Sequence, residues 1–138
     1  MSAKTAKEIQ GDFLAMVKAS PLAEAINGSV YHAGLRPRDS QLEDITVSFV
    51  SGLTNQIQTG VIAISIFVPD IDPYRNGVYV EDMFRTSALE RITQDWIDNL
   101  PETNTNYELR LQDTIATINE PTLKQHFISI MLHYKLFD

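Results

Sequence analysis

The sequence predicts one α+β domain, in which two main helices pack on one face of a mostly antiparallel sheet of about five strands. Two observations carry this prediction. Apolar residues recur with the helical period in two segments, and they alternate with a period of two in the segments between and after them. With 138 residues, of which 43% are hydrophobic and 21% are charged, the chain has the size and composition of a single domain, residues 1–138.

The first helix is expected over residues 5–19, because its apolar residues fall on one helical face. These residues are Ile9, Phe13, Met16 and Val17. Pro21 ends or restarts this helix, since proline disfavours the helical conformation in the residue before it. A short helical turn over residues 22–26 then follows, with Gly28 as its candidate C-cap.

The second helix is expected over residues 82–99, with Asp82 as its N-cap. Its apolar stripe consists of Leu89, Ile92, Trp96 and Leu100. Pro101 stops the helix, and residues 102–106 form a polar linker to the last part of the chain.

Five segments have the alternation of strands, at residues 29–32, 45–49, 56–68, 107–115 and 128–136. The last two are expected to form an antiparallel hairpin. The third is apolar on both faces, which predicts a central strand covered on both sides by helix, sheet or a neighbouring subunit.

The composition excludes several classes of function. A formal charge of −7 argues against a protein that binds nucleic acid by neutralising phosphates. The absence of cysteine removes disulfides, thiolate nucleophiles and thiolate metal sites, and weakly favours a cytosolic protein. The start of the sequence lacks the apolar run of a signal peptide. Residues 61–68, the most apolar run, are far shorter than a membrane-spanning helix, which needs about 20 residues.

The polar residues form no recognisable catalytic or metal-binding motif. His126 and His133 lie seven apart on an expected strand and therefore face opposite sides, and His32 is far away in the sequence. Neither a Gly-x-Ser-x-Gly elbow nor a glycine-rich phosphate loop is present. We therefore predict no catalytic, cofactor-binding or metal-binding residue.

A charged stretch that runs from the expected first strand segment into the second, residues 31–49, contains the first candidate interface residues. Arg36 and Arg38 flank Pro37, which keeps this part extended. Either arginine can form a bidentate ion pair with Asp39 or Glu43, within the chain or across a subunit boundary. A solvated loop that leads into an edge strand is the structural alternative.

The loop over residues 68–82 contains the remaining candidate interface residues, Asp70, Asp72 and Arg75. Its aspartates resemble the start of a calcium loop, but Tyr74 and Arg75 stand where further oxygen ligands are needed. A turn held by aspartates is the preferred interpretation.

Several short motifs between residues 28 and 72 resemble a family of small prophage proteins of the tail-completion or tail-terminator class of long-tailed phages. They are Val30-Tyr31, Arg36-Pro37-Arg38-Asp39-Ser40, Glu43-Asp44, Gln56-Ile57-Gln58-Thr59-Gly60 and Val68-Pro69-Asp70. The final strand is weakly similar as well, and the order of elements resembles that of tail terminators.

This resemblance implies a non-enzymatic virion protein without a cofactor. Such a subunit forms a ring homo-oligomer, commonly a hexamer, at the end of the tail tube and contacts tail-tube and neck proteins. It implies assembly in the host cytoplasm, then a place in the virion, with neither membrane nor sequence-specific nucleic acid as a partner.

Two other functions remain open. The cluster between Arg36 and Asp44 is also compatible with a small cytosolic hydrolase. An exposed sheet edge is compatible with an adaptor that binds a partner peptide as an added strand.

Overall fold

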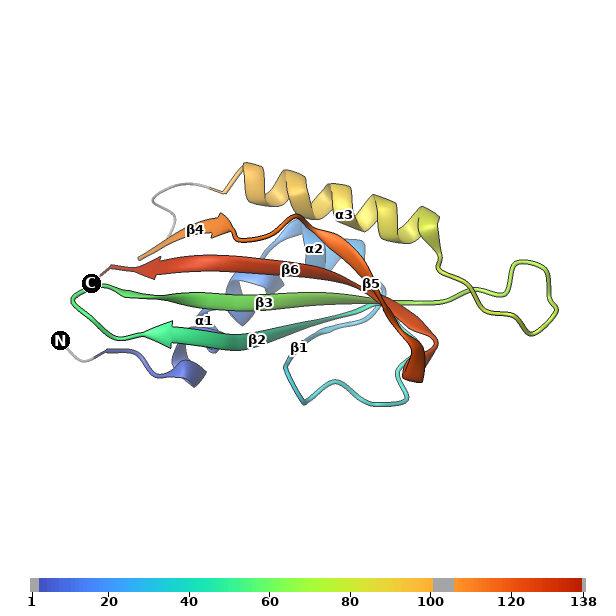
Figure 1. Ribbon diagram of the computed structural model, residues 1–138, viewed down its shortest axis with the longest axis horizontal. Coiled ribbons are helices and arrows are strands. Elements are labelled where there is room, and N and C mark those ends of the chain that lie inside the picture. Colours follow the sequence, from blue (N-terminus) through green and yellow to red (C-terminus); the bar gives the residue numbers. More distant parts are fainter. Residues whose placement is uncertain (1–2, 101–105, 138) are drawn as a thin grey trace.

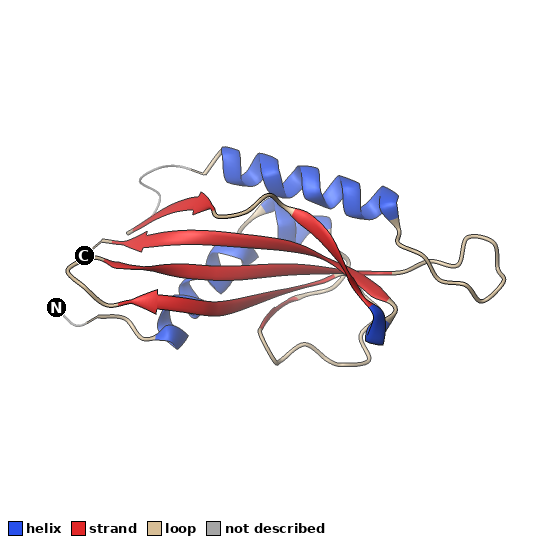
Figure 2. Ribbon diagram, in the orientation of Figure 1, coloured by secondary structure: helices blue, strands red, loops and turns tan. Residues whose placement is uncertain are grey.

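Three helices lie on one face of a six-stranded sheet in the computed structural model, which describes residues 3–100 and 106–137 (Figures 1 and 2). In chain order the elements are α1 (Ala6–Lys18), α2 (Pro21–Ala25), β1 (Val30–His32), β2 (Asp44–Leu53), β3 (Gln58–Pro69), α3 (Met83–Asp98), β4 (Tyr107–Leu111), β5 (Ala116–Glu120), the 3-10 turn η1 (Pro121–Leu123) and β6 (Gln125–Leu136). The sheet order is β1-β2-β3-β6-β4, and β5 also pairs with β6. All pairs are antiparallel except β1 with β2, so the predicted fold class is confirmed.

The sixth strand arises because the segment expected as one strand over residues 107–115 leaves the sheet before its end. β4 and β5 pair with different halves of the long strand β6. Between them Ile115 turns into the core and is only 8% exposed. The expected hairpin with the final strand is confirmed for β5 and β6, which are antiparallel from Glu120 opposite Gln125.

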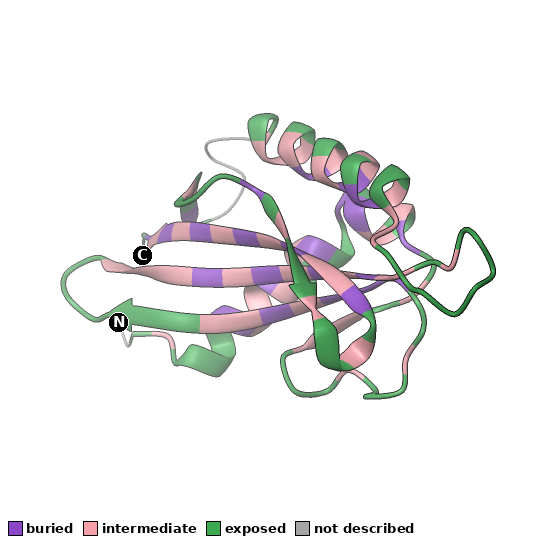
Figure 3. Cartoon of the chain, turned by 45° about the vertical axis from the view of Figure 1, so that its right-hand side comes forward, coloured by how far each residue is buried: buried purple, intermediate pink, exposed green. Residues whose placement is uncertain are grey.

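β3 is the central strand, as predicted, and pairs along its whole length with β6. Its residues Ile62, Ile64 and Ile66 face the helices and are fully buried. The residues between them are only half-buried, because among the described elements no helix covers this second face (Figure 3). The expected cover on both faces is therefore present on one face only within the chain.

This second face is called the open face below. It consists of Thr46 and Ser48 of β2, Thr59, Val61, Ala63, Ser65 and Phe67 of β3, and Phe127, Ser129, Met131, His133 and Lys135 of β6. Small side chains dominate its centre, and residues 33–43, the loop between β1 and β2, reach one end of it, where Arg36 lies over the ring of Phe67. Figure 1 shows this loop beside the sheet.

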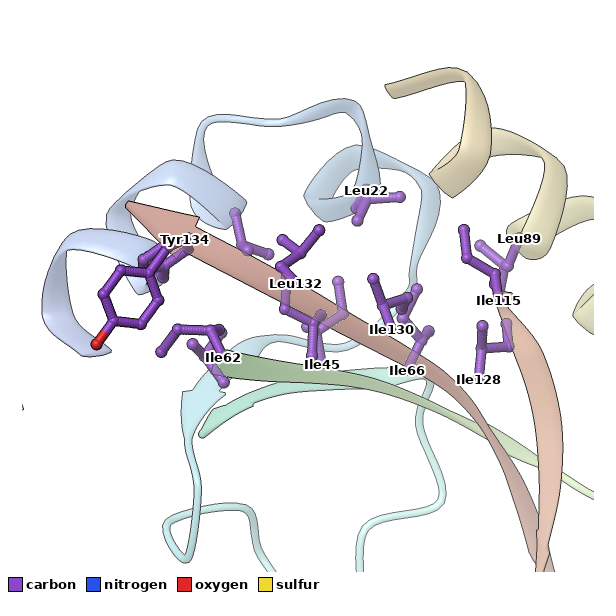
Figure 4. Close-up of a cluster of buried hydrophobic side chains, with 14 of the residues drawn as sticks. Leu22, Ile45, Ile62, Ile66, Leu89, Ile115, Ile128, Ile130, Leu132 and Tyr134 are labelled. Atoms are coloured by element: carbon purple, nitrogen blue, oxygen red, sulfur yellow. The ribbon is translucent and has the colours of Figure 1, made fainter. Parts of the chain in front are cut away.

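The core lies between the sheet and the helices (Figure 4). α1 begins with a capping box of Thr5 and Glu8 and buries Phe13 completely, which confirms the predicted apolar face. Figure 4 shows Leu89 of α3 beside Ile115 and Ile128 at one end of the core. The helix layer is therefore continuous over the buried face of the sheet.

The prediction for Gly28 was wrong. α2 ends at Ala25 with Ile26 as its C-cap, two residues earlier. Gly28 instead lies against the start of β2, where a Cβ atom would overlap the Asp44 carboxylate and the Glu43 carbonyl oxygen. Close approach of the backbone, and not a left-handed conformation, explains the glycine.

Pro101 and residues 102–105 of the expected polar linker lie outside the described residues. In the part of the chain that is described, no helix has both the length and the apolar character needed to cross a membrane.

The central strand should dominate stability. Ile64→Ala is expected to lower the free energy of unfolding by about 2–5 kcal/mol, because it leaves a cavity under the helices. Ile118→Ala on β5, where the side chain is 45% exposed, is the control and should change this free energy by less than about 1 kcal/mol. Urea denaturation measures both, and equal losses would contradict the assignment of the core.

Candidate functional site

The charged stretch folds around the carboxylate of Asp44, the first residue of β2, which is fully buried. Its Oδ1 accepts a hydrogen bond from the backbone N–H of Ser29 at 2.9 Å. Its Oδ2 accepts from Nε of Arg36 at 2.9 Å and from the hydroxyl of Ser40 at 2.5 Å. These four residues, Ser29, Arg36, Ser40 and Asp44, are called the Asp44 cluster below.

Arg36 closes the loop over the end of the open face. Its guanidinium lies 4.2 Å from the ring centre of Phe67 on β3, a cation–π distance. It also donates to the backbone carbonyl of Leu42 at 3.2 Å. On the other side of the loop, the side chain of Gln125 on β6 donates to the carbonyl of Ser40 at 2.8 Å. The loop is thus fixed to two strands that lie far from it in the sequence.

Glu43, the residue before β2, points the opposite way, toward the helices, because adjacent side chains of an extended backbone face opposite sides. The guanidinium of Arg85 in α3 binds it in a bidentate pair at 2.7 and 2.8 Å and also donates to the carbonyl of Ala25. These hydrogen bonds to Glu43 raise the pKa of Arg85 above its ordinary value, against the effect of burial. The backbone of Glu43 is bound by Asn27 and Gly28, so this residue joins the sheet to α2 and α3.

The structure thus separates the candidate residues of this stretch. Arg36 forms an ion pair, but with Asp44, while Glu43 pairs with Arg85 instead of with an arginine of the loop. Arg38 and Asp39 are exposed, and neither side chain has a polar partner within the described residues.

Ser40, Asp44 and Arg85 bind the charged stretch within the chain but are absent from the candidate interface residues identified from the sequence. Ser40 and Asp44 carry one sequence signal, an arginine-proline turn followed by a serine four residues before the acidic residue that opens a strand. No sequence signal connects Arg85 with Glu43, which lies 42 residues before it.

The loop after β3 forms a projecting arm, defined here as residues 70–82 (Figure 1). At its base Ile71 pairs with Val80, and Asp70 accepts a hydrogen bond from Nδ1 of His126 at 2.7 Å. Asp82 caps α3 as predicted, by accepting from the N–H of Arg85. The two ends of the arm are therefore held together.

Asp72 holds the tip of the arm. Its two carboxylate oxygens accept hydrogen bonds from the N–H groups of Asn76 and Gly77 at 3.1 and 2.9 Å. This arrangement is a turn stabilised by an aspartate, as preferred from the sequence. Arg75 lies within this turn, with a backbone φ of 55°, and is exposed.

The arm and the first turn of α3 expose seven large apolar side chains. They are Ile71, Tyr74, Val78, Tyr79, Val80, Met83 and Phe84. Tyr74 and Phe84 are the most exposed, at 81% and 83%. The sequence predicted a loop here. Its apolar side chains indicate a binding surface only once the structure shows that they remain exposed in the folded chain.

A hollow of about 610 Å³ between α1 and the end of α3 contains the polar side chains of Lys4, Asp12 and Tyr107. Asp12 accepts hydrogen bonds from both of the others. Burial and this hydrogen bond raise the pKa of Tyr107, which keeps its hydroxyl protonated. None of the described residues that line the hollow is a histidine, so it offers no imidazole as a general base.

Among the described residues, no group of three or more His, Cys, Asp or Glu side chains has a geometry that could hold a metal ion. No protein-family model and no curated protein matches this chain.

Removal of the Asp44 carboxylate should be far more costly than removal of a neighbouring one. Asp44→Ala leaves the Arg36 guanidinium and the Ser29 N–H without their acceptor, and we expect a loss of about 3–5 kcal/mol in the free energy of unfolding. Asp39→Ala, five residues away and exposed, should change it by no more than about 0.5 kcal/mol. Equal effects in urea denaturation would show that the Asp44 cluster is not a structural anchor.

Proposed function

We propose that this chain is a non-enzymatic structural subunit of a phage or prophage that acts by self-assembly. Its place would be a ring at the tail tube, in tail completion or head–tail joining. The projecting apolar arm is the single observation that carries the assembly part of the proposal. The resemblance of residues 28–72 to tail-completion proteins supports the other part of the proposal, that the assembly is a ring at the tail tube.

The arm has the properties of a binding element. Its side chains are exposed in the single chain, although contiguous apolar patches are uncommon on monomeric proteins. Its base is held by the Ile71–Val80 pair and its tip by Asp72, so little conformational entropy is lost when it binds. A flexible loop with the same composition would be a weaker argument.

The charged stretch supports the same proposal indirectly. A hydrolase that used it would need several charged groups close together and free to contact substrate, and among the described residues of the stretch only Arg38 and Asp39 are exposed and without a polar partner. Asp44 and Glu43 are instead occupied by Arg36 and Arg85 within the chain. The Asp44 cluster is better explained as the anchor of the loop over residues 33–43. Self-assembly therefore remains the preferred function.

The acidic charge fits a subunit that works close to packaged DNA without binding it. With a net charge of −7, the chain as a whole is repelled by phosphates. Expected partners are other copies of itself and tail-tube and neck proteins.

The mass of the protein in solution tests the proposal. We expect light scattering at rising concentration, with and without the tail-tube protein, to give a multiple of the monomer mass, and electron micrographs to show rings. A protein that stays monomeric under both conditions would overturn the proposal. Capture of a host protein with no virion protein would favour the adaptor instead.

A further inference from the structure

The turn between β2 and β3 lies at the end of the sheet opposite to the arm (Figures 1 and 3), and the residues around it form a second apolar surface. Around the turn between β2 and β3, Val50, Leu53 and Ile57 are 49%, 65% and 43% exposed. Phe137 adds to this surface at the end of β6, with 40% of its area exposed. The molecule therefore presents one apolar surface at each end of its long axis.

The second surface contains a hollow of about 370 Å³. It is lined by Ser51, Gly52, Leu53, Thr59, Gly60, Val61 and His133. The register of β2 shifts between Phe49 and Ser51, which inserts Val50 as an extra residue. Such a bulge bends a strand and increases its twist, which accounts for a concave surface at this end.

The lining of the hollow suits an aromatic side chain with a polar end. Leu53 and Val61 provide apolar walls. Within residues 3–100 and 106–137, the side chains of Ser51, Thr59 and His133 have no hydrogen-bond partner. A tyrosine fits this combination, because its ring is apolar and its hydroxyl both donates and accepts.

Tyr74 is such a side chain and stands at the tip of the arm. It is 81% exposed, and the turn that carries it is held by the two hydrogen bonds of Asp72. A rigid, exposed aromatic residue opposite a pocket is the usual form of an interface hot spot.

The charges of the two ends are complementary. The arm carries four carboxylates and one arginine, a net formal charge of −3. Beside the hollow, the described residues of β4 and β6 place the cations Arg110 and Lys135 next to one carboxylate, Glu108, because register puts Arg110 opposite His133 and Glu108 opposite Lys135. Two arms placed together would bring like charges into contact, so an arm favours the opposite end of another copy over another arm.

From these observations we infer that the arm of one copy docks on the hollow of a second copy. The ring of Tyr74 lies between Leu53 and Val61, and its hydroxyl reaches the polar groups of Ser51, Thr59 or His133. This contact is head-to-tail, so an open chain of copies always keeps one free arm at one end and one free hollow at the other, and these two pair only when the chain closes into a ring. The inference rests on the proposed self-assembly and names its interface.

Cysteine cross-linking tests the contact directly, because the natural sequence contains no cysteine. A variant with Tyr74→Cys and Leu53→Cys should form a ladder of dimers, trimers and larger products under mild oxidation. Tyr74→Cys alone can give no product larger than a dimer. The control pairs Tyr74→Cys with Glu24→Cys, an exposed position on α2, and should give no ladder. Equal ladders in both double variants, or dimers only, would overturn the inference.

Association measured in solution separates this inference from the proposed function. Tyr74→Ala and Leu53→Lys should each weaken association by about tenfold or more, while Tyr74→Phe should retain most of it. Both residues are exposed, so unchanged melting temperatures should show that the variants are folded. If the natural protein assembles and both variants assemble equally well, the inference fails and the proposed self-assembly stands. A natural protein that never assembles overturns both.

Discussion

The buried carboxylate of Asp44 is the interaction on which the end of the sheet beside the arm depends. A carboxylate that is fully removed from water must have its oxygens bound by donors, or it destabilises the fold strongly. Its donors come from the residue before β1 and from two places in the loop after it. One side chain therefore fixes the start of β1, the path of residues 33–43 and the beginning of β2. Gly28 is part of the same constraint, because any side chain there would occupy the space of this carboxylate.

The neighbouring residue extends this constraint to the helix layer. Since adjacent side chains of an extended backbone face opposite sides, Glu43, just before β2, points to α3 while Asp44 points to the loop. The bidentate pair of Glu43 with Arg85 holds the first turn of α3, immediately after the arm. The other side of the arm is held by Asp70 and His126. The arm therefore starts and ends at residues that are bound to the sheet, and this gives it a defined direction.

Hydrophobic periodicity was enough to predict the fold class, because burial on one face imposes a period of 3.6 on helices such as α1 and a period of two on strands such as β3. Local chemistry was enough for the Asp82 cap and for the Asp72 turn, since both act within five residues of their own position. The partners of Asp44 and Glu43 were beyond prediction for a different reason. An ion pair between residues 42 apart exists only after the fold has brought β2 to α3, and nothing in the sequence near Glu43 indicates Arg85. The break between β4 and β5 likewise depends on a tertiary event, the burial of Ile115 beneath α3.

The same long strand connects the two apolar ends of the molecule. β3 passes the hollow at Thr59 and Val61 and leads into the arm after Pro69. It is paired on both sides, with β2 and with β6, so it cannot bend independently of the sheet. At about 3.3 Å per residue, its 12 residues separate the two ends by roughly 40 Å. A head-to-tail contact closes into a ring only when each step repeats the same rotation. A docking surface and a projecting arm at the two ends of one rigid strand satisfy that requirement, because the rotation is then set by the fold and not by a flexible joint.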